Sequence, residues 1–67
     1  MPQITLKAAR VNAGLTQKDA SERINVSIST LKNWEKGVTY PKQPHIMKIC
    51  EVYGIQYDHI FFDQKIS

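Results

Sequence analysis

Residues 17–36, with the sequence QKDASERINVSISTLKNWEK, decide the fold because they predict two short helices joined by a tight turn. The first helix begins after Thr16, whose hydroxyl can accept from free backbone amides while the carboxylate of Asp19 accepts in return. It ends at Asn25, because asparagine tolerates the left-handed conformation that a helix end requires. Ser27 then offers a cap for the second helix. The rest of the chain is expected to pack around this pair.

The two helices are predicted to separate a buried face from an outward one. In the first helix, Ala20 and Ile24 lie four positions apart and therefore share one face. In the second, each residue turns the helix by about 100°, so Leu31 and Trp34 lie close together and mark the buried direction. Glu35, the only carboxylate of this helix, falls on the inner half. The outward half, polar and free of acid, holds Ser29, Lys32, Asn33 and Lys36, with Ile28 and Thr30 at its edges.

A further helix is predicted ahead of this pair. Thr5 can cap its start and Gly14 can end it. Leu6, Ala9 and Ala13 form its apolar stripe.

Two more helices are predicted behind the pair. Gly37 ends the second helix, and Pro44 suits the first turn of the next one, which runs to Gly54. Its apolar positions recur at helical spacing: Ile46, Ile49, Cys50 and Tyr53. In residues 55–62, Asp58 favours a short fifth helix, although the composition is also compatible with a strand. The predicted fold is all-α, with five short helices.

The composition predicts a single globular domain, residues 1–67, with the helix pair at its centre. A chain of 67 residues is near the lower size at which one core folds unaided, and 42% of these residues are hydrophobic. Cys50 is the only cysteine, so no internal disulfide is expected. The apolar runs are too short for a signal peptide or a membrane span, so a cytoplasmic location is expected.

The net charge of +3 is unevenly placed along the chain. Residues 1–42 contain seven of the nine Lys and Arg residues but three of the six acidic ones. The positive charge therefore lies with the helix pair. A polyanion is the simplest partner that this pattern indicates, although a modest charge split is also common on ordinary solvated surfaces.

Taken together, these segments resemble the compact helix-turn-helix domain of lambda-type phage repressors and Cro proteins. The resemblance covers about residues 4–62. It is carried by GLTQ at 14–17, INVS at 24–27, STLKNWEKG at 29–37, Pro41, and IMKICEVYGI at 46–55. The chain departs from the usual pattern at Ala20, Ser21 and Asn25, where the family favours a large aliphatic residue, Ala and Gly.

The resemblance implies residues that contact DNA. In this family the second helix of the pair lies in the major groove and meets base edges near its start. The implied base contacts are Ile28, Ser29, Lys32 and Asn33. The implied phosphate contacts are Gln17, Lys36, Thr39, Tyr40 and Lys42. Each has a simpler alternative as a solvated polar residue, and Ile28 as a half-buried packing residue.

Two further sets of residues follow from the same comparison. Arg10 and Glu35 match a pair that meets beneath the second helix in related proteins; as a surface ion pair it would contribute roughly a few tenths of a kcal/mol. The aromatic C-terminal end is the best candidate for a dimer surface, through Tyr57, Ile60, Phe61 and Phe62. Closure of the core is the alternative for those side chains.

The expected function is that of a sequence-specific, double-stranded DNA-binding transcriptional regulator, a Cro-type repressor that binds a near-palindromic operator as a homodimer. At 67 residues the chain is expected to hold no appended ligand or cleavage domain. The alternative is a protein-interaction module, such as an antitoxin or anti-activator. No enzymatic activity, cofactor, small-molecule ligand or membrane partner is expected. His45 and His59 have no further ligands at metal-binding spacing, so no metal site is expected either.

Overall fold

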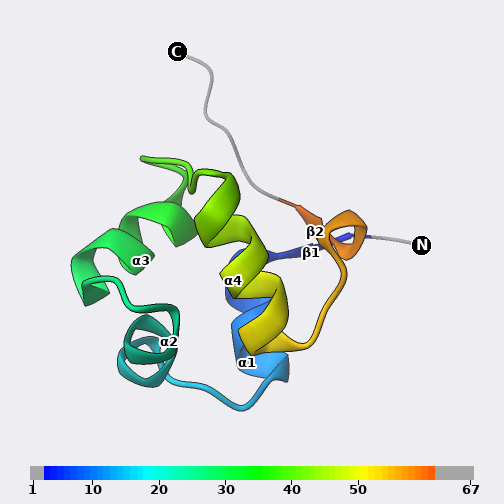
Figure 1. Cartoon of the computed structure of the whole chain (residues 1–67), viewed down its shortest axis with the longest axis horizontal. Coiled ribbons are helices and arrows are strands. Elements are labelled where there is room, and N and C mark those ends of the chain that lie inside the picture. Colours follow the sequence, from blue (N-terminus) through cyan, green and yellow to red (C-terminus); the bar gives the residue numbers. More distant parts are fainter. Residues whose placement is uncertain (1–2, 62–67) are drawn as a thin grey trace.

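Four α-helices and one pair of short parallel strands make up residues 3–61, the part of the chain that this computed structural model describes (Figure 1). In chain order the elements are β1 (Ile4–Thr5), α1 (Leu6–Asn12), α2 (Gln17–Ile24), α3 (Ile28–Lys36), α4 (Gln43–Tyr53), the single 3-10 turn η1 (Tyr57–His59) and β2 (Ile60–Phe61). The helix pair predicted in residues 17–36 is thus α2 and α3.

The predicted caps are confirmed at the start of three helices. Thr5 Oγ1 accepts a hydrogen bond from Ala8 N at 3.1 Å at the start of α1. Thr16 Oγ1 accepts from Asp19 N at 3.0 Å, and the Asp19 carboxylate accepts from Thr16 N at 3.5 Å, which completes a capping box at the start of α2. At the start of α3, the hydroxyl of Ser27 caps the amide of the third following residue at 3.1 Å. Local chemistry therefore fixes where these helices begin.

The turn between α2 and α3 depends on a left-handed residue. Asn25 has φ 69°, the one positive φ outside glycine among residues 3–61. Asparagine adopts this conformation at a smaller cost than most residues. Gly37 ends α3 in the same conformation, with φ 76°. Both predicted helix ends are confirmed.

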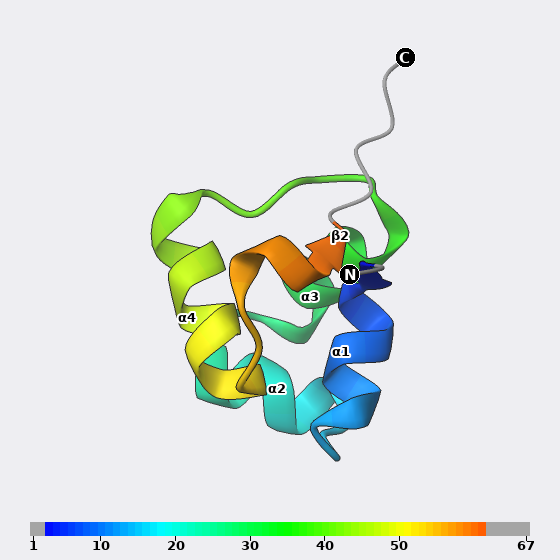
Figure 2. The ribbon, with the colours of Figure 1, turned by 90° about the vertical axis from the view of Figure 1, so that its right-hand side faces the viewer.

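The core lies where α2 packs against α3 and α4, with α1 and the strands closing one side (Figures 1 and 2). Leu31 and Ile49 are its largest fully buried side chains. The other buried apolar residues are Leu6, Ala9, Ala20, Ile24, Trp34, Ile46, Tyr53 and Ile60. The departures Ala20 and Ser21 are buried at the packed face of α2, where small residues let helices approach closely.

The mostly helical fold is as predicted, but the count of five α-helices is not matched, because the fifth segment forms the 3-10 turn η1 and then a short strand. After η1, Ile60 takes an extended conformation, and β2 pairs in parallel with β1 in the register Ile4↔Ile60 and Thr5↔Phe61. Figure 2 shows β2 beside the start of α1. Ile60 is 2% exposed, so the strand places a β-branched residue against the core.

The predicted apolar stripe of α1 also needs a correction. Leu6 and Ala9 are buried, but Ala13 is exposed at the end of the helix. Arg10 is buried in its place, 7% exposed. The reason is an ion pair that compensates its charge, described below.

Candidate nucleic-acid interface

The outward face of α3 has the composition that the sequence predicts, and most of its residues are exposed. Leu31 and Trp34 are buried, 0% and 7% exposed, and they fix which side of the helix faces the core. The exposed residues on the other side are Ile28, Ser29, Lys32 and Lys36, and Asn33 is half-buried. The carboxylate of Glu35 turns inward, so this face carries donors and two ammonium groups but no acid.

The first turn of α3 is tied down at its cap. Ser27 Oγ lies 2.8 Å from Thr30 Oγ1 and accepts from Thr30 N. These hydroxyl groups are therefore occupied within the turn. Ile28 and Ser29 lie between them and are exposed.

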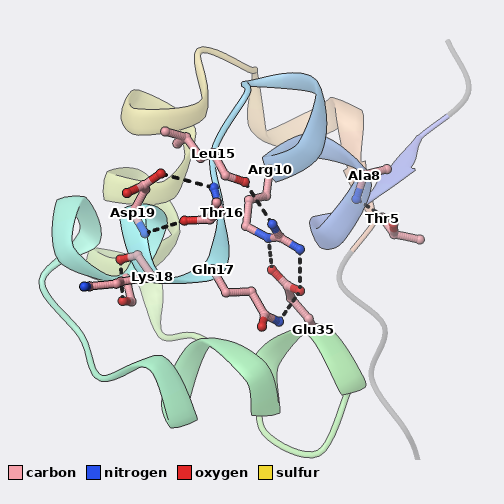
Figure 3. Close-up of polar contacts among 10 residues, drawn as sticks. Thr5, Ala8, Arg10, Leu15, Thr16, Gln17, Lys18, Asp19 and Glu35 are labelled. Carbon is pink, nitrogen blue, oxygen red and sulfur yellow. Dashed lines mark hydrogen bonds and ion pairs between the residues drawn. The ribbon is translucent and has the colours of Figure 1, made fainter.

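A buried polar cluster lies beneath α3, formed by Arg10, Leu15, Gln17 and Glu35 (Figure 3). Arg10 Nε donates to Glu35 Oε2 at 2.7 Å, and Arg10 Nη2 donates to Glu35 Oε1 at 3.4 Å. Arg10 Nη1 donates to the Leu15 carbonyl at 2.9 Å. Gln17 Nε2 donates to Glu35 Oε1 at 3.1 Å. The cluster connects α1, the turn after it, α2 and α3.

The Arg10–Glu35 pair is predicted correctly as a contact but wrongly as a surface pair. The two side chains are only 9% and 5% exposed. The two charges are compensated by the two-point contact, and the Leu15 carbonyl and the Gln17 amide add one hydrogen bond each, to Arg10 and to Glu35. A buried ion pair is tolerated when its remaining polar atoms are satisfied in this way. The pair therefore fixes how α3 sits on α1.

Gln17 lies at the first residue of α2, half-buried, with its amide engaged by Glu35. Nothing in the sequence pattern indicates this bond, because the two residues lie 18 positions apart. The capping box satisfies the amides of Thr16 and Asp19. The backbone amides of Gln17 and Lys18 are in the first turn of α2, where a helix leaves its amides without acceptors, and no hydrogen bond from them is found within residues 3–61.

The loop after α3 exposes the other four predicted phosphate contacts: Lys36, Thr39, Tyr40 and Lys42. The Asn33 carbonyl accepts from Val38 N at 2.9 Å and from Thr39 N at 3.4 Å. These hydrogen bonds fix the backbone at the beginning of the loop. Tyr40 and Tyr57 interact with each other. Partial burial of the Tyr40 hydroxyl raises its pKa, and the neighbouring Tyr57 raises this pKa further. The loop is thereby linked to η1.

The predicted dimer residues do not all lie on the surface. Tyr57 is 52% exposed, but Ile60 closes the core and offers no surface to a partner, so that part of the prediction is wrong. Phe61 is the second residue of β2. Phe62 lies outside the described residues.

In residues 3–61 no cluster of His, Cys, Asp and Glu could hold a metal ion, and no helix combines the length and apolarity needed to cross a membrane. The ring of His45 packs against Trp34 with centroids 5.2 Å apart. Cys50 is half-buried, and burial raises its pKa. The Tyr53 hydroxyl is buried without a hydrogen-bond partner among the described residues. This burial is the main reason why the pKa of Tyr53 is raised to about 12, and the negative charge of Glu35 also raises it.

The sequence profile of a family described as helix-turn-helix matches residues 6–60, which contain α1 to α4 and end in the first residue of β2. The chain belongs to the helix-turn-helix family. It is 32% identical over 62 residues to the HTH-type transcriptional regulator ImmR of Bacillus subtilis, covering 92% of this chain and 49% of that protein. The chain thus spans about half the length of this curated relative. No solved structure matches it significantly. The helix-turn-helix match supports a DNA-binding transcriptional regulator.

Proposed function

We propose that this protein is a sequence-specific regulator of transcription that places α3 in the major groove of double-stranded DNA. The observation that carries the proposal is the outward face of α3, which is polar and free of acid while the opposite face is fixed by a buried core and a buried ion pair. A helix held in this way keeps its outward side chains in register with base edges.

Four side chains are assigned to base edges: Ile28, Ser29, Lys32 and Asn33. The Asn33 amide can pair with adenine through one donor and one acceptor. The Lys32 ammonium can donate to guanine, and the exposed Ile28 can pack on a thymine methyl group. Ser29 can donate or accept.

The phosphate contacts are assigned to two places on either side of α3. At the start of α2, the Gln17 side chain joins two free backbone amides that already favour an anion. After α3, the exposed residues Lys36, Thr39, Tyr40 and Lys42 form the second place. These contacts would set the position of α3 on the duplex without reading its sequence.

A homodimer on a near-palindromic operator completes the proposal. One short domain covers too few base pairs to be specific, so two copies about one helical turn, roughly 34 Å, apart are needed. Tyr57, which is 52% exposed, is the predicted dimer residue that supports a contact between two copies. Like a Cro-type repressor, the dimer would act by blocking polymerase.

Selection of bound sites from random DNA tests this function, because a recovered site reports both sequence preference and two-fold symmetry. Asn33→Ala should then cost about 1–3 kcal/mol on the best site and relax the preference at one base pair. An equal loss on all sequences would move Asn33 to the phosphate class.

The salt dependence of binding tests the phosphate contacts. Lys36→Ala should weaken binding to all sequences and lower the salt slope by about one. Lys48→Ala is the matched control, because Lys48 is bound to Glu51 on α4, outside the proposed surface. An unchanged slope for Lys36→Ala would remove Lys36 from the interface. Absence of any salt-dependent binding would favour the protein-interaction module instead.

A further inference from the structure

We propose that Glu35 is a positioning residue for DNA binding: its carboxylate fixes the side-chain amide of Gln17 so that one N–H of that amide faces outward to a phosphate. This inference rests on the proposed function, because it concerns how one of its DNA contacts is prepared. It assigns a role to a residue that does not itself touch DNA.

The orientation of the Gln17 amide follows from the chemistry of its partner. Gln17 Nε2 lies 3.1 Å from Glu35 Oε1. A carboxylate paired with arginine only accepts hydrogen bonds, so the atom that faces it is the amide nitrogen and not the oxygen. That nitrogen carries two N–H groups. Glu35 takes one of them, and the second remains to donate.

Without this restraint, a glutamine amide would turn freely at the protein surface. In the flipped orientation it would present its oxygen to the phosphate, and two acceptors repel each other. Each immobilised side chain also costs about 0.5–1.5 kcal/mol of conformational entropy on binding. Glu35 removes both obstacles for Gln17 before DNA is bound.

Glu35 can act in this way because its own carboxylate is buried and hydrogen-bonded. Two bonds from Arg10, at 2.7 and 3.4 Å, hold its carboxylate, and Arg10 is held in turn by the Leu15 carbonyl at 2.9 Å (Figure 3). The Glu35 side chain is 5% exposed. A buried acid on the inner side of α3 thus determines the direction of a donor at the start of α2.

A double-mutant cycle on the full chain separates positioning from a structural role. The first change is Gln17→Ala, measured in the native chain and in an Arg10→Met/Glu35→Leu background. That background replaces both members of the buried pair by apolar side chains, a change that proteins often tolerate without loss of stability. The cycle subtracts any general effect of the background on DNA affinity.

In the native chain, Gln17→Ala is expected to raise the Kd by about tenfold or more, equally for all sequences, because it removes a bond to a charged group. The salt slope should stay unchanged, since glutamine carries no charge. In the Arg10→Met/Glu35→Leu background, the same substitution should change the Kd less than about twofold. Equal factors in the two backgrounds, or no effect in either, would overturn the role of Glu35.

A second measurement needs no variant. In the native chain, one side-chain amide proton of Gln17 should show the NMR shift of a proton bonded to a carboxylate, and it should keep this shift when DNA is added while the other proton moves. Loss of the first shift on DNA binding would overturn the proposal. Failure of the chain to bind DNA at any salt concentration would instead overturn the proposed function.

Discussion

Removal of the Arg10 guanidinium is expected to destabilise the domain severely. Arg10→Met leaves the Glu35 carboxylate buried, 5% exposed, with Gln17 as its one remaining donor among residues 3–61. Breaking a buried pair in this way costs about 3–5 kcal/mol. The whole free energy of unfolding of a domain of this size is about 3–10 kcal/mol. The variant should therefore lose most of its stability, and its Tm should fall by more than about 12 °C.

The Arg10→Met/Glu35→Leu double variant should recover most of this loss, because no uncompensated charge remains. Both variants are measured by urea unfolding followed by far-UV circular dichroism. The control is Lys48→Met, which breaks the Lys48–Glu51 pair, whose side chains are 47% and 75% exposed. It should change the free energy of unfolding by no more than about 0.5 kcal/mol. An Arg10→Met loss as small as that of the control would refute the burial argument, as would a double variant less stable than Arg10→Met.

The remaining predictions also concern stability. Tyr53→Phe should leave stability unchanged or raise it by up to about 1 kcal/mol in urea unfolding, because it removes a buried hydroxyl without a partner among the described residues; a clear loss would indicate a bound water. The pKa of Tyr53 is raised from 10.0 to about 12 in the folded state, so between these pH values the folded chain keeps a proton that the unfolded chain releases. The free energy of unfolding should therefore fall as the pH rises from 10.0 to about 12. Tyr53→Phe should reduce that fall. Asn25→Ala should lower the free energy of unfolding by about 1 kcal/mol and Asn25→Gly should not, since φ is 69° there; equal effects would contradict a conformational cause. Ile60→Ala should cost about 2–4 kcal/mol against less than about 0.5 for the exposed Met47→Ala, and similar values for the two would contradict the placement of β2 in the core.

The features that the sequence predicts well are those decided by a few neighbouring residues. Thr16 and Asp19 form their capping box within one turn, and Asn25 ends α2 by its own conformational preference. The inward direction of Glu35 also follows from helix geometry once Leu31 and Trp34 mark the core. The outward face of α3 can therefore be assigned from helical periodicity alone.

The features that the sequence does not predict depend on contacts between distant residues. The strand at Ile60 exists because β1 is available to pair with it, and its local composition fits a helix or a strand. Arg10 is buried only because Glu35 meets it from α3. The bond from Gln17 to Glu35 needs the exact distance between two helix axes, which periodicity does not contain.

The parallel pairing of β1 with β2 also sets the order in which the domain folds. It joins Ile4 to Ile60, and Gln3 Nε2 donates nearby to the carbonyl of Asp58, 55 positions away. Closing a loop of this length costs chain entropy before the two-residue strands can form any hydrogen bonds. Helices α2 and α3, by contrast, meet across a short turn, so their contact closes only a small loop. We therefore expect the helices to assemble first and the two ends of the described chain to dock last. The amides of β2 should be among the first to exchange with solvent deuterium, while those at the centre of α3 should be among the last.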